Sequence, residues 1–148
     1  MRAALDDAGI AAEIVVLPGA AHTARLAAEF LGCDVAQIAN SLVFRAETSG
    51  GAVLVMSSGA RRIDVKRLAA HVGEPIGKAD ATFVRDHTGF AIGGVAPVGH
   101  TGSLRRYVER SLSAFPTVWA AAGHPSTVFS LAYADLVRIT GSEIDAAS

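Results

Sequence analysis

Two short, nearly continuous apolar runs, SLVF at 41–44 and AVLVM at 52–56, stand on either side of Thr48-Ser49-Gly50-Gly51. The turn residues predict a hairpin between two strands. Because neither run alternates with polar residues, we expect both strands to be covered on both faces. A sheet buried in this way needs further layers packed against it, and helical segments elsewhere in the chain are the natural source.

Helices are expected where capping residues coincide with apolar spacing. Thr23, Asp64 and Asp80 can cap helices over 24–31, 65–72 and 81–87, which would stop at Gly32, Gly73 and Gly89. In the first of these, Leu26, Phe30 and Leu31 are predicted to share the buried face. Further helices are predicted over 2–8 and 133–140, and strands over 12–17, 39–46, 52–56, 104–109, 117–121 and 127–131.

In all, the chain is expected to hold about seven strands and four or five helices, which interleave irregularly along the sequence. The pattern predicts an α/β or α+β fold with a mixed sheet rather than a regular βαβ array. The 148 residues contain no repeat or low-complexity linker. One domain spanning 1–148 is therefore expected.

Charge and composition exclude several classes of protein. Thirteen Lys and Arg against fourteen Asp and Glu give a net charge of −1, which argues against coating nucleic acid by bulk charge. No apolar run approaches the ~20 residues of a membrane span, and two Asp interrupt the first ten residues, where a signal peptide would be apolar. We therefore expect a cytoplasmic protein with no membrane partner.

The segment from Gly89 to His100 (GFAIGGVAPVGH) is rich in glycine and too irregular for a helix. Glycines let the main chain approach a ligand closely and turn its N–H groups toward an oxygen. The segment is neither a phosphate-binding loop nor a dinucleotide fingerprint, since it lacks both motifs. From spacing alone, a ligand-binding loop and a plain turn at a sheet corner are both open.

The other reactive side chains carry weaker signals. The five histidines show no zinc-binding spacing and no cysteine pair accompanies them, so no metal site and no cofactor is expected. Cys33 follows a helix end and is predicted to be a core thiol, and Trp119 and Phe129 are likewise expected in the core. Arg61-Arg62, Lys66-Arg67 and Arg105-Arg106 are candidates to touch phosphate, the alternative being an ordinary solvated face.

Taken together, these segments resemble the YbaK/EbsC family of aminoacyl-tRNA deacylases, which is related to the editing domain of bacterial prolyl-tRNA synthetases. The resemblance covers nearly the whole chain and includes the family's G-x-x-x-P loop as Gly93 to Pro97. The matching segments are HTA at 22–24, ANSLVFR at 39–45, SSGARRIDVKRLA at 57–69, TGFAIGGVAPVGH at 88–100, WAAAGHPSTVFSL at 119–131 and ADLVRITG at 134–141.

The resemblance implies a mixed, strongly curved sheet or barrel-like core with helices around it. It also implies metal-independent hydrolysis of the ester that joins a wrong, small amino acid such as Cys or Ala to tRNA, with tRNA(Pro) as the candidate. The partners would be the tRNA 3′ end and an aminoacyl-tRNA synthetase. On this resemblance the catalytic residues are Asn40, Gly93 and Gly94, and the substrate-binding residues are His22, Thr23, Ser57, Pro97, Gly99, His100 and Gly123.

Asn40 departs from the family pattern, which usually has a functional lysine at this place. A neutral amide makes hydrogen bonds about half as strong as those of an ammonium, so slower catalysis is expected unless another cation substitutes. Lys66, Lys78 and Arg61 are the possible substitutes. Two alternatives stay open: a non-catalytic relative that binds aminoacyl-tRNA or a nucleotide-like ligand in the same cleft, and a partner-binding domain that has lost the site.

Overall fold

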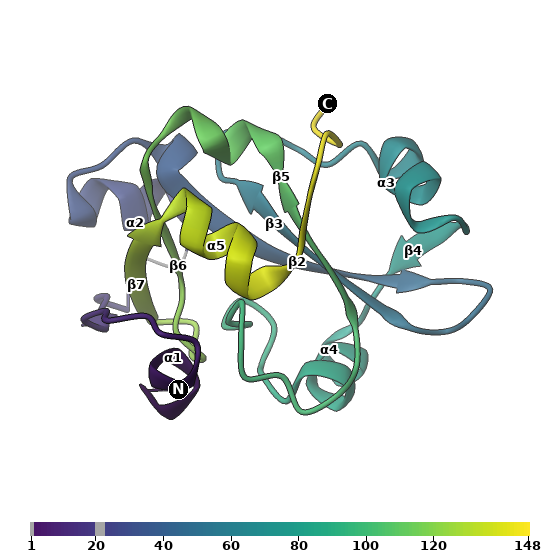
Figure 1. The fold of residues 1–148 in the computed structure, drawn as a ribbon, viewed down its shortest axis with the longest axis horizontal. Coiled ribbons are helices and arrows are strands. Elements are labelled where there is room, and N and C mark those ends of the chain that lie inside the picture. The colour runs from purple at the N-terminus through teal and green to yellow at the C-terminus, as the bar shows by residue number, and fades with distance from the viewer. Residues whose placement is uncertain (1, 20–22) are drawn as a thin grey trace.

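The computed structural model describes residues 2–19 and 23–148 and shows a mixed α/β fold, as predicted (Figure 1). The α-helices are α1 (Arg2–Asp7), α2 (Ala24–Leu31), α3 (Val65–Val72), α4 (Ala81–Thr88) and α5 (Tyr133–Thr140). The strands are β1 (Val15–Val16), β2 (Ile38–Ala46), β3 (Ala52–Ser58), β4 (Ile76–Lys78), β5 (Arg105–Glu109), β6 (Thr117–Ala121), β7 (Thr127–Ala132) and β8 (Ser142–Ile144). Two short 3₁₀ helices, η1 (Val35–Gln37) and η2 (Arg110–Ala114), complete the described part of the chain.

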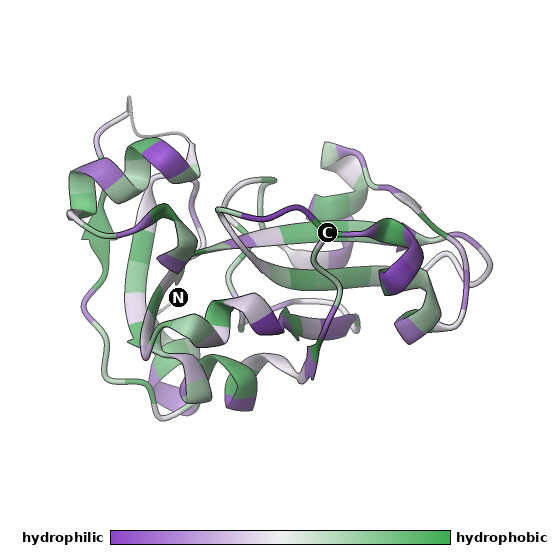
Figure 2. Cartoon of the chain, turned by 90° about the horizontal axis from the view of Figure 1, so that it is seen from above, coloured by the Kyte–Doolittle hydropathy of each residue, from purple (hydrophilic) through white to green (hydrophobic). Residues whose placement is uncertain are grey.

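The strands form one mixed sheet in the order β1-β7-β6-β2-β3-β5-β8, with β4 paired to β2 beside this path. The β2–β3, β6–β7, β1–β7 and β2–β4 pairs are antiparallel, whereas β2–β6, β3–β5 and β5–β8 are parallel. β6 and β7 run at a steep angle to the β2–β3 hairpin, which shows that the sheet is strongly twisted (Figures 1 and 2). In the part of the chain described, β1 and β8 remain unpaired to each other, so the expected curved sheet is present but does not close into a barrel.

Local capping accounts for where three helices begin. The side chains of Thr23, Asp64 and Asp80 accept hydrogen bonds from main-chain N–H groups in the first turns of α2, α3 and α4. Each cap satisfies a donor that has no partner within the helix. These helices end at Gly32, Gly73 and Gly89, all of which have positive φ.

The central strand β3 is buried at every position and separates two apolar layers. Leu54 and Met56 belong to the larger cluster, to which Leu136 of α5 contributes, while Val53 and Val55 pack with Leu68 of α3. Figure 2 shows the hydrophobic residues concentrated along these strands. The predicted two-sided cover is therefore correct for β3, whereas residues 42–44 of β2 are only half-buried.

Other expectations need correction. Phe30 was placed on the buried face of α2, yet its side chain is 54% exposed, because Ala27 and Ala28 make that face instead. The strand expected at 12–17 shrinks to β1, and the three-residue strands β4 and β8 were not predicted. Such short strands form through pairing with β2 and β5, which leaves no pattern in their own residues. None of the helices described is long and apolar enough to cross a membrane.

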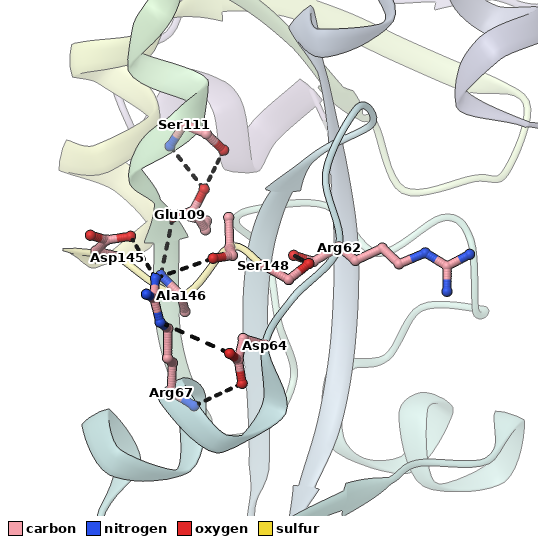
Figure 3. Close-up of polar contacts among 9 residues, drawn as sticks. Arg62, Asp64, Arg67, Glu109, Ser111, Asp145, Ala146 and Ser148 are labelled. Atoms are coloured by element: carbon pink, nitrogen blue, oxygen red, sulfur yellow. Dashed lines mark hydrogen bonds and ion pairs between the residues drawn. The ribbon is translucent and has the colours of Figure 1, made fainter.

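A buried carboxylate holds the segment after β8 against the sheet (Figure 3). Glu109, at the end of β5, is 1% exposed. It accepts hydrogen bonds from the main-chain N–H groups of Ser111 (2.8 Å) and Ala146 (3.1 Å), and from the Ser111 hydroxyl. Outside it, Arg67 forms ion pairs with Asp64 and Asp145 at 3.9 and 3.6 Å. The carboxylate therefore satisfies donors from two separate chain segments at once.

Replacing Glu109 should test this arrangement. Glu109→Ala leaves the Ser111 and Ala146 N–H groups without their acceptor, and each such loss costs about 1–3 kcal/mol. We therefore expect the free energy of unfolding, measured by urea denaturation, to fall by about 2–4 kcal/mol. Glu109→Gln, which keeps one acceptor oxygen, should lose less. A loss below about 1 kcal/mol in the alanine variant would contradict the assigned role.

Candidate active site

One of the two edges of β2 is only partly paired with neighbouring strands; we call it the outer edge. One edge pairs with β3 from Ala39 to Arg45. The other pairs with β6 at Ile38 and Ala39 and with β4 from Phe44 to Ala46. Between these two contacts, residues 40–43 have no ladder partner on this edge among the described strands. The sheet therefore splits open where β6 turns away from β2.

A pocket of about 90 Å³ occupies the start of this split. Its walls come from β2, α2, β6, β7 and the glycine-rich loop, so segments far apart in the sequence meet here. The lining residues are Leu17, Thr23, Ala24, Ala27, Ile38, Ala39, Asn40, Ser41, Gly93, Trp119, Ala120, Ala121, Pro125, Thr127 and Val128. Most are small or apolar, and a few polar groups face the same space, as is typical of ligand sites.

Asn40 lines the pocket from β2 and is half-buried. Ser57 lies directly opposite it in the β2–β3 register, so the two side chains share one face of the sheet. The Ser57 side chain is buried, and its hydroxyl has no hydrogen-bond partner among the residues that the structure describes. A buried hydroxyl without a partner is costly and rare. This one stands opposite Asn40.

The glycine-rich loop is held close to β2 by defined contacts. The Ser41 hydroxyl donates to the main-chain oxygen of Val95 at 2.5 Å. Gly93 has φ +85 and lines the pocket. A Cβ on Gly94 would lie 2.8 Å from the main chain of His124 and Pro125, so only glycine lets the loop approach that turn. The loop thus reaches the pocket because Gly94 has no side chain.

Thr23 and Trp119 also line the pocket. Thr23 lines the pocket while its hydroxyl caps α2, accepting from the Leu26 N–H at 3.2 Å. Trp119 is half-buried on β6 and borders the pocket, in addition to packing against the apolar cluster behind α2. It was expected only in the core, which Phe129 does occupy. A single tryptophan has no spacing signal, so only its register opposite Ile38 reveals its place.

Other proposed site residues lie away from this pocket. Pro97 is buried, Gly99 is exposed with φ +84 beside Ala4, and Gly123 belongs to the turn that carries Pro125. His100 is half-buried, with its Nε2 2.6 Å from the Ala96 oxygen and its ring edge-on to Phe90. Within the 93–100 segment, Gly93 therefore lines the pocket, whereas residues 94–100 do not. His22 lies outside the described residues.

No charged side chain lines the pocket in the part of the chain that the structure describes. The three cations considered as substitutes for the lysine are exposed elsewhere: Lys66 on α3, Lys78 on β4, and Arg61 at a separate hollow of about 430 Å³. Over the same residues, no group of three His, Cys, Asp or Glu side chains is placed to hold a metal ion. The polar groups at the pocket are therefore neutral.

Cys33 is not part of the site. It is half-buried in the apolar cluster behind α2. Burial raises the pKa of its thiol, and the nearby Asp34 raises it further. A thiol with a raised pKa is mostly protonated at neutral pH and is a poor nucleophile. This agrees with the core role predicted from the sequence.

Comparison with known proteins decides the family. The family model of the aminoacyl-tRNA editing domain matches residues 18–139. The chain belongs to this family. The YbaK/EbsC resemblance is thereby confirmed at the family level.

Individual relatives agree with this assignment. The uncharacterized protein YwhH of Bacillus subtilis (strain 168) is 31% identical over 122 residues, which are 82% of this chain and 77% of YwhH. A crystal structure of a proposed trans-editing enzyme for prolyl tRNA synthetase superposes with a TM-score of 0.93 at 39% identity, covering 99% of this chain and 94% of that one. The hypothetical protein APE2540 shares the fold, with a TM-score of 0.87 at 23% identity over 97% of this chain and 96% of its own.

His100 packs against the glycine-rich loop through Ala96, and its burial predicts that the stability of the protein depends on pH. Burial lowers the pKa of the imidazole and the Arg106 cation lowers it further, although the bond to Ala96 opposes both. Below about pH 6.5 the unfolded chain therefore binds a proton that the folded chain resists. The contribution of His100 should be complete above that pH and be lost as the pH falls through the lowered folded-state pKa.

Urea unfolding at pH 7.5 and at steps down to pH 5 measures this loss. His100→Gln, which can still donate to the Ala96 oxygen, should lose less stability on acidification than the parent. The control is His71→Gln, the same substitution at an exposed position on α3. Equal acid sensitivity in the parent and His100→Gln would show that His100 does not titrate in this way.

Proposed function

We propose that this editing domain hydrolyses the ester bond of mischarged aminoacyl-tRNA, with the aminoacyl group in the pocket beside β2. The observation that carries the proposal is the meeting of Thr23, Asn40 and Gly93, from three distant segments, at one small pocket. Membership of the aminoacyl-tRNA editing domain family supplies the substrate class. The match to a proposed trans-editing enzyme over 99% of the chain supports one editing domain across 1–148.

The proposed hydrolysis can be assisted by neutral hydrogen-bond donors. Attack on the ester carbonyl places negative charge on its oxygen, which fixed hydrogen-bond donors stabilise. The Asn40 carboxamide and the main-chain N–H of Gly93 are the proposed donors, because the Gly94 N–H already donates to the Ala91 oxygen at 2.9 Å. We propose water as the nucleophile, because the polar side chains that line the pocket are a neutral amide and hydroxyls, and no histidine is among the described lining residues. Neither step calls for a metal ion.

The pocket size favours a small amino acid. At ~10–15 Å³ for each water-sized site, about 90 Å³ accommodates about six to nine non-hydrogen atoms. An alanyl or cysteinyl group is of this size, and the small wall residues Ala24, Ala27 and Ala120 set the limit. The proposed carrier of the wrong amino acid is tRNA(Pro), because one structural relative is described as a proposed trans-editing enzyme for prolyl tRNA synthetase.

The neutral lining also favours a second candidate function. Asn40 can hydrogen-bond an aminoacyl ester without accelerating its hydrolysis, since it lacks the charge of an ammonium. A non-catalytic protein that binds aminoacyl-tRNA in this pocket would have the same neutral lining. Activity assays separate the two functions.

Introducing the family's lysine should raise activity. Asn40→Lys places an ammonium where negative charge develops, and we expect hydrolysis to accelerate about ten-fold or more, equivalent to ~1.4 kcal/mol of transition-state stabilisation. Its free energy of unfolding should stay within about 1 kcal/mol of the parent, because the long side chain can reach the open pocket. The measurement is a deacylation time course with Cys-, Ala- and Ser-charged tRNA(Pro), with and without EDTA.

Asn40→Ala is the matched control and should hydrolyse more slowly than the parent. Equal rates in all three proteins would show that this position does not act on the ester. No hydrolysis by the parent, together with binding of the charged tRNA, would favour the non-catalytic function. Loss of activity in EDTA would contradict the metal-independent reaction.

Arg61 and Arg62 are the proposed contact to tRNA phosphates. They follow β3 closely: Arg61 is three residues after Ser58, which puts its Cα within about 11 Å of the strand end that pairs with Ala39. Neither forms an ion pair with a described residue, whereas Arg67 pairs with Asp64 and Asp145 and Arg105 pairs with Glu74. Arg61 lies at a hollow separate from the pocket, and cations outside the pocket that are free of ion pairs with described residues suit the phosphates of an acceptor end. A synthetase partner would add affinity through effective concentration.

Arg61→Ala/Arg62→Ala should lower kcat/KM for charged tRNA roughly ten-fold at low salt and flatten its salt dependence, because two phosphate contacts are lost. Hydrolysis of a short aminoacyl-adenosine ester should be unchanged. Arg85→Ala, which removes an exposed cation from α4, is the control and should affect neither substrate. In Figure 1, α4 lies across the molecule from the C-terminal segment that contacts Arg62. An equal effect on both substrates would contradict the phosphate role.

A further inference from the structure

The hydrogen-bond pattern of β2 shows which residues face its open edge. On the β3 side, the Gly59 N–H donates to the Ile38 oxygen (2.8 Å) and the Ala46 N–H donates to the Gly51 oxygen (2.9 Å). In an antiparallel pair, every second residue turns both main-chain groups toward the neighbouring strand. Both contacts set the same alternation, so the even-numbered residues of β2 face β3.

The odd-numbered residues therefore direct their N–H and C=O groups to the outer edge. Ala39 faces β6 and Arg45 faces β4, in register with Ala120 and Gly77. Ser41 lies between them, where no described strand pairs with β2. Unpaired main-chain groups at a sheet edge are ready to pair with another chain. At Ser41 the edge is open within the pocket itself.

The Ser41 side chain is already engaged. Its hydroxyl donates to the Val95 oxygen, so it holds the glycine-rich loop in place. What Ser41 can offer a ligand is therefore one main-chain donor and one main-chain acceptor, both directed to the same side. The described lining also includes no carboxylate to receive a ligand's ammonium group.

We infer that the aminoacyl group of the substrate pairs with Ser41 as a strand one residue long. The substrate's α-ammonium donates to the Ser41 carbonyl oxygen, and the Ser41 N–H donates to the substrate's ester carbonyl. This is the reciprocal pair that two opposed residues form in an antiparallel sheet. An aminoacyl ester carries the required donor and acceptor on adjacent carbons. The inference rests on the proposed function and assigns the groups that recognise its substrate.

The pairing has chemical consequences. It fixes the plane of the ester carbonyl and gives its oxygen a rigid donor that strengthens as negative charge develops. It also requires the α-amino group, so a plain acyl ester would lose half of the pair. Recognition by the main chain does not depend on the amino acid's side chain, whose selection is left to the alanine-rich wall.

A comparison of Ser41→Pro with Ser41→Ala tests the donor. Both variants lose the hydroxyl, but only proline loses the N–H, and proline is tolerated where a strand's N–H points off the sheet. With Ala-tRNA we expect kcat/KM of Ser41→Pro to be about 100-fold below that of Ser41→Ala, the effect of removing one such donor. Equal values for two folded variants would overturn the inference while leaving the deacylase function intact.

NMR of the unmodified protein provides a second test that needs no variant. The probe is 3′-deoxy-3′-(alanylamino)adenosine, a non-hydrolysable analogue, with adenosine as the control. The analogue should slow hydrogen exchange of the Ser41 amide and shift its resonance, whereas adenosine should not. If Ser41→Pro does not fold, bound analogue without this protection overturns the inference. If the unmodified protein neither hydrolyses Ala-tRNA nor binds the analogue, the proposed function itself is wrong.

Discussion

The hydrogen-bonded pairing of β2 with β3 is the interaction on which the rest of the structure depends. Seven consecutive residue pairs, from Ala39–Ser58 to Arg45–Ala52, align the two strands. Their register puts Val53 and Val55 in one apolar layer and Leu54 and Met56 in the other, so α3 and α5 have surfaces on which to pack. It also places Asn40 opposite Ser57. A shift of one residue would turn each of these side chains to the wrong face.

Because this hairpin uses one edge of β2 completely, the other edge decides where a ligand can enter. β6 and β4 each take one end of that edge, and the strong twist of the sheet carries β6 away before it can pair further. The space between them is filled partly by the glycine-rich loop, which approaches through Gly94 and the Ser41–Val95 hydrogen bond. The pocket is thus a gap in strand pairing, lined by neutral groups, while Arg67 and Arg105 are held in surface ion pairs outside it.

Much of the fold was predictable because its signals are local. Thr23, Asp64 and Asp80 begin helices through contacts within one turn, and Gly32, Gly73 and Gly89 end them, so short sequence windows sufficed. β4 and β8 escaped prediction because three residues become a strand only when a partner strand is beside them. Phe30 was misplaced for a related reason. On a helix whose packed face is made of Ala27 and Ala28, a large apolar residue can remain outside.

By itself, the sequence determined the α/β class, most helix ends, the hairpin and the family, whose G-x-x-x-P loop and strand motif are contiguous runs of residues. Only the tertiary structure decided which members of those runs share a pocket. Gly93 faces it while Pro97 and His100 stand behind, and Trp119 and Ser41 join it without any pattern of their own. The physical reason is that a pocket at a sheet edge depends on register and twist. Both arise from pairing between distant segments and are absent from any one of them.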